Sequence, residues 1–231
     1  MNGYLRALSS TVGTKYLVAV TGLVWVLFVT VHMLGNLQIY LGPEAINSYA
    51  AFLKSKPGPL WVARVILLAA LVVHVWGITK LTLANREARP IPYAVKKTAR
   101  STFSSRTMVM SGLVLLSFVI YHLLHFTIGI THPEHFHLRD SMGRHDVYSM
   151  TILGFQQPIV SIAYIVATAL LGLHLSHGVA SLFQTMGASR PKIAPLIERF
   201  SLAVTLMVVS GNIAIPLSAL FGLIEPAQGP K

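Results

Sequence analysis

The sequence predicts an all-α membrane protein, built as a bundle of five transmembrane helices. Apolar residues make up 54% of the 231 residues and charged residues only 11%, a balance far from that of a soluble globular domain. Five apolar stretches are each long enough to cross the ~30 Å hydrocarbon layer, which takes about 20 helical residues. Little chain remains for an extramembrane domain, so we expect residues 1–231 to form a single membrane domain.

The first apolar stretch runs from Tyr16 to Leu41. It exceeds the ~7 to 15 apolar residues of a signal-peptide core, so we expect it to stay in the mature protein. The other four stretches run from Leu60 to Thr82, Thr107 to Ile130, Thr151 to Phe183 and Phe200 to Ile224. Most prolines fall between the stretches, where helix breakers belong, whereas Pro158 and Pro216 lie inside them and are candidates for kinks.

Basic residues gather at one end of the predicted bundle. They are Arg6, Lys15, Lys80, Arg86, Arg89, Lys96, Lys97, Arg100, Arg106, Arg190, Lys192 and Arg199. The positive-inside rule places this end in the cytoplasm, with the N-terminus inside and the C-terminus outside, as five spans require. The net charge of +11 then follows from topology and from anionic lipid head groups, and no nucleic-acid partner is expected.

Four histidines lie inside four different apolar stretches. They are His32, His74, His122 and His174. Hydrocarbon offers an imidazole no hydrogen bonds, so intramembrane ionisable residues are functional candidates. A helix rise of ~1.5 Å per residue puts His32 and His122 ~22 to 24 Å from the cytoplasmic boundary and puts His74 and His174 ~12 Å from it. Two pairs at matched depths predict two haems, each held between two imidazoles, whereas one histidine alone would more simply be an interhelical hydrogen-bond partner.

Two further histidines complicate the ligand assignment. His125 and His177 each follow a proposed ligand by three residues and share nearly the same helix face. Either could replace its neighbour as a haem ligand, or contact a haem propionate or a quinone head group. Each replacement would move a ligand by ~4.5 Å along its helix, so the depth match favours His122 and His174.

Several spacings match the landmarks of a known family. They are Thr21-Gly22 followed ten residues after the glycine by His32, the run Pro43-Glu44-Ala45-Ile46-Asn47-Ser48 in the first outer loop, Ser111-Gly112 followed ten residues after the glycine by His122, and His174 followed four residues later by Gly178. On these residues, nearly the whole chain resembles the cytochrome b membrane anchor of succinate:quinone oxidoreductases (succinate dehydrogenase and fumarate reductase), in the class with one five-helix subunit and two b haems.

The resemblance implies a role for each intramembrane pair. His74 and His174 would bind the inner, proximal haem, and His32 and His122 the outer, distal haem. The family spacings also point to His122 over His125 and to His174 over His177. The function implied is electron transfer between membrane quinone, either menaquinone or ubiquinone, and the succinate/fumarate couple, in a bacterial cytoplasmic membrane.

The chain lacks the residues that would bind iron–sulfur clusters or a flavin, which implies partner subunits. The chain contains no cysteine, which excludes a disulfide framework, cysteine-ligated iron–sulfur clusters and covalent c-type haem attachment. It also lacks a dinucleotide-binding fingerprint. The resemblance therefore implies a flavoprotein subunit and an iron–sulfur subunit on the basic cytoplasmic face, and a dimer of heterotrimers would fit it.

Some assignments stay open at this point. Glu44 could exchange protons at an outer quinol site or be a solvated loop charge. The loop 131–148 is rich in histidine, but four histidines without a fixed frame do not justify assigning a metal there. The alternative functions are a dihaem cytochrome b of another quinone-linked dehydrogenase, such as a hydrogenase or formate dehydrogenase, and a haem-free transporter that relays protons through its histidines.

Overall fold

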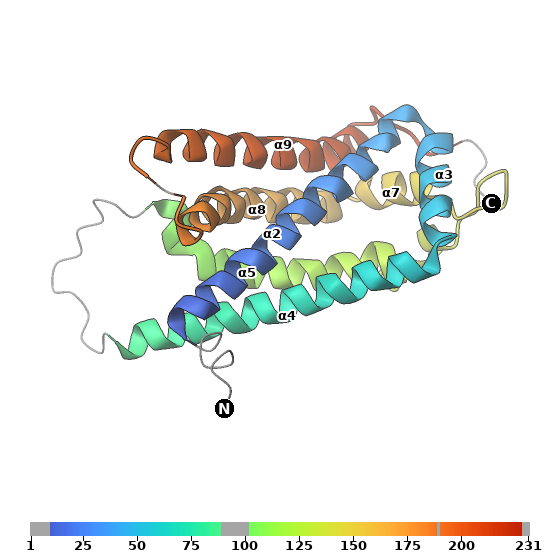
Figure 1. The fold of residues 1–231 in the computed structure, drawn as a ribbon. Coiled ribbons are helices and arrows are strands. Elements are labelled where there is room, and N and C mark those ends of the chain that lie inside the picture. The colour runs from blue at the N-terminus through green and yellow to red at the C-terminus, as the bar shows by residue number, and fades with distance from the viewer. Residues whose placement is uncertain (1–9, 89–101, 189, 228–231) are drawn as a thin grey trace.

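The computed structural model describes residues 10–88, 102–188 and 190–227 (Figure 1). The helices are α2 (Thr11–Asn36), continued by the 3-10 helix η1 (Leu37–Leu41), α3 (Pro43–Lys54), α4 (Pro57–Glu87), α5 (Phe103–His122), continued by the π-helix η2 (Leu123–Ile128), α6 (Pro133–Phe136), α7 (Val147–Phe155), α8 (Pro158–Thr185) and α9 (Ala194–Leu220). Within this part of the chain, five helices are long and apolar enough to cross a membrane, which confirms the predicted fold class.

The outward faces of these helices are apolar. On α2, Leu27 and Val31 expose 59% and 61% of their surface, and on α4, Val65 and Leu68 expose 60% and 64%. A soluble protein rarely leaves such continuous apolar faces in contact with water. Hydrocarbon covers them without cost, and the helical backbone satisfies its own hydrogen bonds there. The chain is therefore a multi-pass membrane protein.

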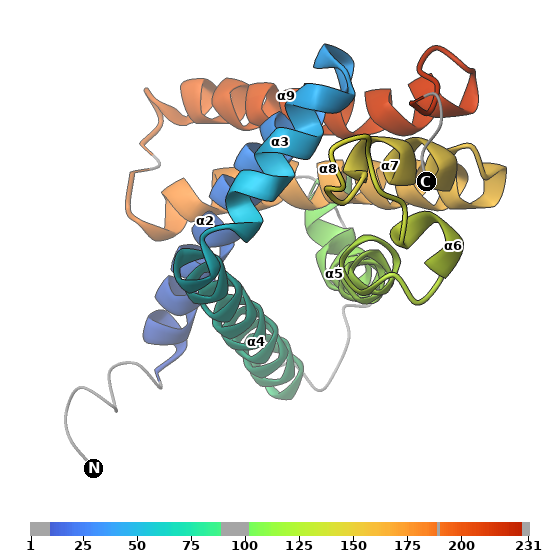
Figure 2. The same ribbon diagram turned by 90° about the vertical axis from the view of Figure 1, so that its right-hand side faces the viewer.

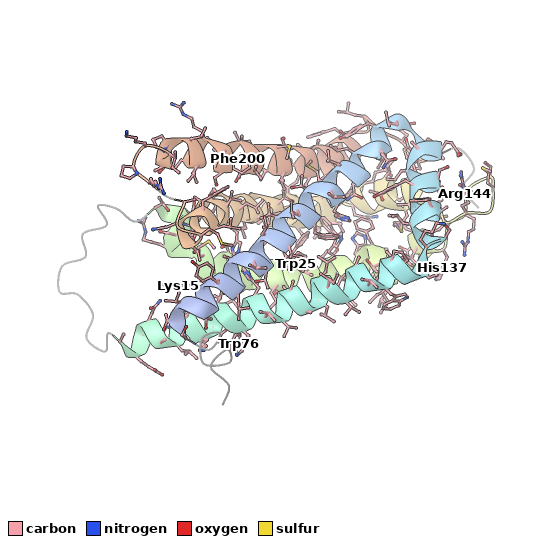
Figure 3. All side chains as sticks on the ribbon, viewed as in Figure 1. Lys15, Trp25, Trp76, His137, Arg144 and Phe200 are labelled. Carbon is pink, nitrogen blue, oxygen red and sulfur yellow. The ribbon has the colours of Figure 1, made fainter. Side chains whose placement is uncertain are left out.

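The bundle is organised around α2 and α8, which pack against each other. Helix α4 packs against α2, while α5 and α9 pack against α8 (Figure 2). The start of α2 and the ends of α4 and α8 lie at the left of Figure 1, together with the starts of α5 and α9. Lys15 marks this end in Figure 3, while Arg144 and His137 lie at the other. Arg6 and the basic residues of segment 89–101 lie outside the described residues, and the orientation in the membrane stays a prediction. The end marked by Lys15 is called the inner end and the end marked by Arg144 the outer end, after that prediction.

The sequence predicted one continuous span over the fourth apolar stretch, and this prediction is wrong. The stretch forms two helices, α7 and α8, that meet at Gln156 and Gln157. The proline ring at position 158 disfavours a helical conformation of the preceding residue, and Gln157 is extended with φ −77° and ψ 112°. Pro158 therefore begins α8 instead of kinking it. Proline is tolerated at the first helical position because the backbone N–H that it lacks would have no partner within the helix. Pro216 does lie inside α9, as predicted.

The predicted first outer loop is also helical. The run Pro43–Lys54 forms α3, which lies across the outer ends of the spans (Figures 1 and 2). Asn47 on this helix is buried; its Nδ2 donates to Asp146 Oδ1 at 3.0 Å, and its Oδ1 accepts from the Tyr148 backbone N–H at 3.0 Å. The amide therefore joins α3 to the start of α7.

A cluster of buried apolar residues lies at this same end of the bundle. Its buried residues are Ile39, Ile46, Tyr148, Ile152, Phe155, Val160, Tyr164, Ile215 and Ala219. They come from η1, α3, α7, α8 and α9. The outer end is thus held by a shared core in addition to the contacts between neighbouring spans, which gives the outer histidine pair firm surroundings.

We predict that Asn47→Ala destabilises the fold by about 2 to 4 kcal/mol, because it leaves the buried Tyr148 N–H without its partner and removes one of the two donors to the buried Asp146 Oδ1. Thermal or chemical unfolding of the full chain in detergent measures this. Ser55→Ala is the control, because the Ser55 hydroxyl bonds only to the Phe52 carbonyl of its own helix. Equal losses in the two variants would show that the Asn47 amide does not hold α3 in place.

Candidate functional site

The structure brings the four intramembrane histidines together as two pairs. His32 of α2 faces His122 of α5, with ring centroids 5.8 Å apart. His74 of α4 faces His174 of α8, with ring centroids 6.5 Å apart. All four rings are half-buried. These are the pairs that the depth argument predicted.

The spacing of the rings suits a shared metal ion. Two imidazole nitrogens that each bind one metal at ~2 Å lie about 4 Å apart, which puts their ring centres about 6 Å apart. Both observed centroid distances, 5.8 Å and 6.5 Å, are close to this value. An ordinary histidine–histidine hydrogen bond is absent from both pairs in the described structure.

Each inner histidine is held by a hydroxyl group from the helix that it packs against. Thr21 Oγ1 of α2 lies 3.1 Å from His74 Nδ1. Ser111 Oγ of α5 lies 3.2 Å from His174 Nδ1. Thr21 and Ser111 therefore contact the inner pair. In the sequence they are recognised by their spacing from the outer histidines, His32 and His122, on their own helices.

The contacts of the two hydroxyl groups allow the inner histidines to be protonated at Nδ1. Thr21 Oγ1 lies 2.7 Å from the Leu17 carbonyl oxygen, and Ser111 Oγ lies 3.1 Å from the Met108 carbonyl oxygen. When each hydroxyl gives its single proton to that carbonyl, its oxygen accepts the Nδ1–H of the imidazole. A neutral imidazole protonated at Nδ1 keeps a free lone pair on Nε2. That is the form in which histidine binds a metal, and the hydrogen bond at Nδ1 raises its basicity.

The glycine of each landmark lies against the same imidazole, at a distance where an added Cβ would make ordinary van der Waals contact. A Cβ atom at Gly22 would lie 3.4 Å from His74 Cε1, and one at Gly112 would lie 3.5 Å from His174 Cε1. Ten residues then separate each glycine from the outer histidine on its helix, His32 or His122. At ~1.5 Å per residue the two levels are about 15 Å apart on both helices.

The outer pair is positioned by aromatic rings and a tyrosine. Phe28 stacks on His32 at 5.2 Å between ring centroids and 17° between ring planes. Tyr164 Oη of α8 lies 3.3 Å from His122 Nδ1 and 3.1 Å from His125 Nδ1. One hydroxyl can accept from the first imidazole and donate to the second, which again leaves Nε2 of His122 free. Tyr164 and Phe28 were missed in the sequence, although a tyrosine at membrane depth signals a hydrogen-bond partner.

The two alternative ligands behave differently from the four paired histidines. His125 lies in the π-helix η2 and is only 3% exposed. Its ring stacks on Phe126, and a Cβ at Gly154 would lie 3.1 Å from its Nε2. His125 contacts Tyr164 of α8, as His122 does, but its ring also lies beside His132, and among the described residues no ring contact joins it to His32. His177 is half-buried on α8, one turn beyond His174.

The glycines that follow the predicted ligands serve two purposes. Cβ atoms at Gly35 and Gly77 would lie 3.0 Å from Tyr49 and 2.6 Å from Val18, so these two glycines serve helix packing. A Cβ at Gly178 would meet no atom within 4 Å. Only Gly178 therefore borders open space beside a ligand, as a flat macrocycle requires.

One buried polar atom near the pairs has no protein partner. Trp25 Nε1 of α2 is buried without a hydrogen bond, and Trp25 lies three residues after Gly22 and seven before His32 (Figure 3). A buried indole N–H normally finds an acceptor, and leaving it unpaired costs about 1 to 3 kcal/mol. A bound group with a carboxylate or carbonyl oxygen between the two levels would satisfy it. The two imidazole pairs and the unpaired Trp25 N–H are the features of the bundle interior on which a proposal of bound haem can rest.

Glu44 is engaged in an ion pair. Arg144 Nη2 donates to Glu44 Oε2 at 2.7 Å and Arg144 Nη1 to Oε1 at 3.1 Å, while Ser48 Oγ donates to Oε1 at 2.6 Å. The Arg144 guanidinium, with help from Ser48, lowers the pKa of Glu44 to about 2. A proton-exchanging group works best with a pKa near the working pH. The geometry therefore favours a structural role for Glu44, which joins α3 to the loop before α7.

The histidine-rich loop brings three donor residues together without forming a tight metal site. Ligand atoms of His132, Glu134 and His135 lie within 4.8 Å of one another. Donors of a tetrahedral site with ~2 Å bonds lie only about 3.3 Å apart. Burial lowers the pKa of His135, and His132 Nδ1 lies 3.3 Å from the exposed Glu134 carboxylate. This group lies outside the two intramembrane pairs and indicates no haem.

Comparison of the chain with protein-family models, with curated proteins and with solved structures found no match. The geometry of the histidine pairs and the family landmarks in the sequence are therefore what supports a functional proposal.

The Glu44 ion pair predicts a specific loss of stability in acid. The pKa of Glu44 falls from 4.5 to about 2 on folding, so its contribution is fully present above pH 4.5 and is lost as the pH falls through about 2. We expect Glu44→Gln to lower the Tm at pH 6 and to flatten the decline of Tm between about pH 4.5 and 2. Glu225→Gln makes the same charge change at an exposed residue and should keep the wild-type decline.

Proposed function

We propose that this chain is the membrane anchor and electron-transfer subunit of a succinate:quinone oxidoreductase and carries two b haems. His74 and His174 hold the inner, proximal haem, and His32 and His122 hold the outer, distal haem. The observation that carries the proposal is that the four intramembrane histidines face one another in two pairs, with ring centroids 5.8 Å and 6.5 Å apart.

The cofactor supplies chemistry that no side chain of this protein can provide. Each haem, when bound between two imidazoles, supplies a one-electron redox centre with no open position on its iron, which favours electron transfer over oxygen chemistry. The protein would hold one haem between His74 and His174 and the other between His32 and His122, at two successive levels along α2 and α5. It also orients the imidazoles through Thr21, Ser111 and Tyr164, and its apolar helices keep water away.

The partners follow from what the chain lacks. Cysteine is absent from the sequence, so iron–sulfur clusters belong to an iron–sulfur subunit, and the flavin belongs to a flavoprotein subunit. Both dock on the basic end of the bundle, which the positive-inside rule places in the cytoplasm of a bacterium. Menaquinone or ubiquinone is the membrane substrate. The family landmarks favour succinate over hydrogen or formate as the electron donor to the complex.

Haem loss from specific variants tests the ligand assignment. A reduced-minus-oxidised visible spectrum with pyridine haemochrome quantitation should find two b haems per wild-type chain. His74→Ala and His174→Ala should each remove one haem, and His32→Ala and His122→Ala should each remove the other, because a half-ligated haem is lost.

The neighbouring histidines provide matched controls. His125→Ala and His177→Ala should keep both haems, since neither residue belongs to a facing pair. Well-folded protein that carries no haem when purified with its partners would refute the proposal and favour the proton-relay transporter. If a hydrogenase or formate dehydrogenase copurified in place of a succinate-oxidising flavoprotein, the two-haem part of the proposal would stand and the proposed partner subunits would be wrong.

The hydroxyl–imidazole hydrogen bonds should tune one haem only. Thr21→Val and Ser111→Ala remove the acceptor of an inner Nδ1–H, which makes the imidazole a weaker donor to ferric iron. We expect both variants to keep two haems and to raise the midpoint potential of the inner haem by about 30 to 60 mV, or up to ten-fold in its redox equilibrium. Thr30→Val is the control, because the Thr30 hydroxyl bonds only to Val26 of its own helix. Potentiometric titration followed in the visible region separates the haems, and equal shifts of both would contradict the assignment.

A further inference from the structure

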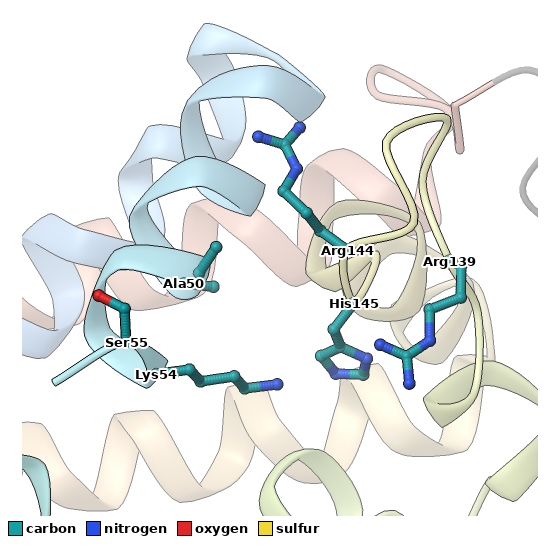
Figure 4. Close-up of a pocket in the computed structure, with 7 residues that line it drawn as sticks. Ala50, Lys54, Ser55, Arg139, Arg144 and His145 are labelled. Carbon is teal, nitrogen blue, oxygen red and sulfur yellow. The ribbon is translucent and has the colours of Figure 1, made fainter. Parts of the chain in front are cut away.

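A hollow with basic walls lies at the outer end of the bundle, between α3 and the loop that precedes α7. Its volume is about 270 Å³ (Figure 4). The residues that line it are Ala50, Ala51, Lys54, Ser55, Arg139, Arg144 and His145. Three of these side chains are cations and a fourth is an imidazole, and none is acidic.

The backbone fixes two of the basic residues side by side. Arg139 and His145 form an antiparallel β-bridge, and the Asp146 N–H donates to the Leu138 carbonyl at 3.0 Å. The turn between them closes through Gly143, which has φ +76°, where a side chain would be strained. Figure 4 shows the Arg139 and His145 side chains close together, with Lys54 extending toward His145 from the end of α3.

The carboxylates nearby are Glu44, Asp140 and Asp146, and none of them pairs with Lys54 or Arg139, although Asp146 Oδ2 is buried without a hydrogen-bond partner. Arg144 is paired with Glu44 and with Asp140, whose Oδ2 lies 2.7 Å from Arg144 Nε. Asp146 Oδ1 accepts from Asn47 and from the Ser149 backbone N–H. Among the described residues, neither Lys54 nor Arg139 forms an ion pair. Two positive charges therefore face the hollow without a counter-ion.

The charges in the hollow act on one another. Burial lowers the pKa of Lys54, and the Arg139 and Arg64 charges lower it further. Burial lowers the pKa of His145 to about 4, again with contributions from Lys54 and Arg139. An anion in the hollow would relieve this repulsion.

Helix position explains only part of the arrangement. Lys54 lies in the last turn of α3, where a cation suits the helix dipole without any ligand. That reason does not apply to Arg139 and His145, which come from a separate segment and converge on the same space. A cation cluster in a concave site, held by a backbone bridge, is suited to binding an anion.

We propose that this hollow binds a phosphate group, carried by a lipid head group or present as free phosphate. Lys54 and Arg139 supply the charge, and Arg139 can present two parallel N–H donors to phosphate oxygens. Lys54 and Ser55 immediately precede α4, one of the five helices long and apolar enough to cross a membrane, so the hollow lies at the end of a candidate span. Nearby on α4, the Arg64 guanidinium lies 5.0 Å from the Trp61 ring centre, and tryptophan is typical of the membrane–water interface.

Thermal unfolding of the delipidated full chain in detergent tests this site, with two phosphate sources. One probe is sodium phosphate against sodium chloride at equal ionic strength. The other is dioleoyl phosphatidylglycerol against dioleoylglycerol, which has the same acyl chains and no phosphate. At about ten times its Kd, a bound probe should raise the wild-type Tm by about 3 to 6 °C.

Two neighbouring lysines provide a matched comparison. Lys54→Gln should weaken binding about ten-fold, whereas Lys56→Gln, with the same charge change outside the hollow, should stay within two-fold of wild type. Arg139→Gln provides a second test from the other side of the hollow. Protection by phosphatidylglycerol alone would identify a lipid as the ligand, and protection by both probes would identify free phosphate as sufficient. No protection beyond the chloride and dioleoylglycerol controls, or equal loss in Lys54→Gln and Lys56→Gln, would overturn the proposal.

Discussion

The interior of this bundle depends on placing imidazoles where no water is available, and three of the four paired imidazoles, His74, His122 and His174, find a hydroxyl on another helix. An unpaired polar group in hydrocarbon is costly, so each ring must be satisfied by a neighbouring helix or by a bound group. Thr21 and Ser111 satisfy the Nδ1 atoms of the inner pair, and Tyr164 satisfies that of His122. These contacts join α2 to α4 and α5 to α8, so the same hydrogen bonds that hold the rings also set which helices are neighbours.

Two helices carry the same arrangement of side chains and so create two levels. On α2 and on α5, a hydroxyl residue and a glycine lie at the inner level, and a histidine follows at the outer level. Each of these helices therefore supports an inner imidazole from the neighbouring helix and provides an outer imidazole of its own. The ten-residue spacing of the landmarks is then the distance between the two levels.

The outer end of the protein is held by different chemistry. Asn47 and Arg144 join α3 to the loop and to α7 through a buried amide and an ion pair, over the buried apolar core at that end. The core packs next to the outer histidine pair, and the basic hollow lies beside it, between α3 and the loop before α7. Glu44 belongs to this structural network, which accounts for its strongly lowered pKa.

The sequence by itself determined the membrane class, the five spans and the grouping of four histidines into two pairs. Hydropathy and depth along a helix depend only on residue order and a constant rise, so both can be calculated from the chain. Tertiary structure decided the rest. The partners of Thr21 and Ser111 lie on other helices, and so does Tyr164, which contacts both His122 and His125. None of these contacts follows from spacing along one helix, because each joins segments that are distant in sequence.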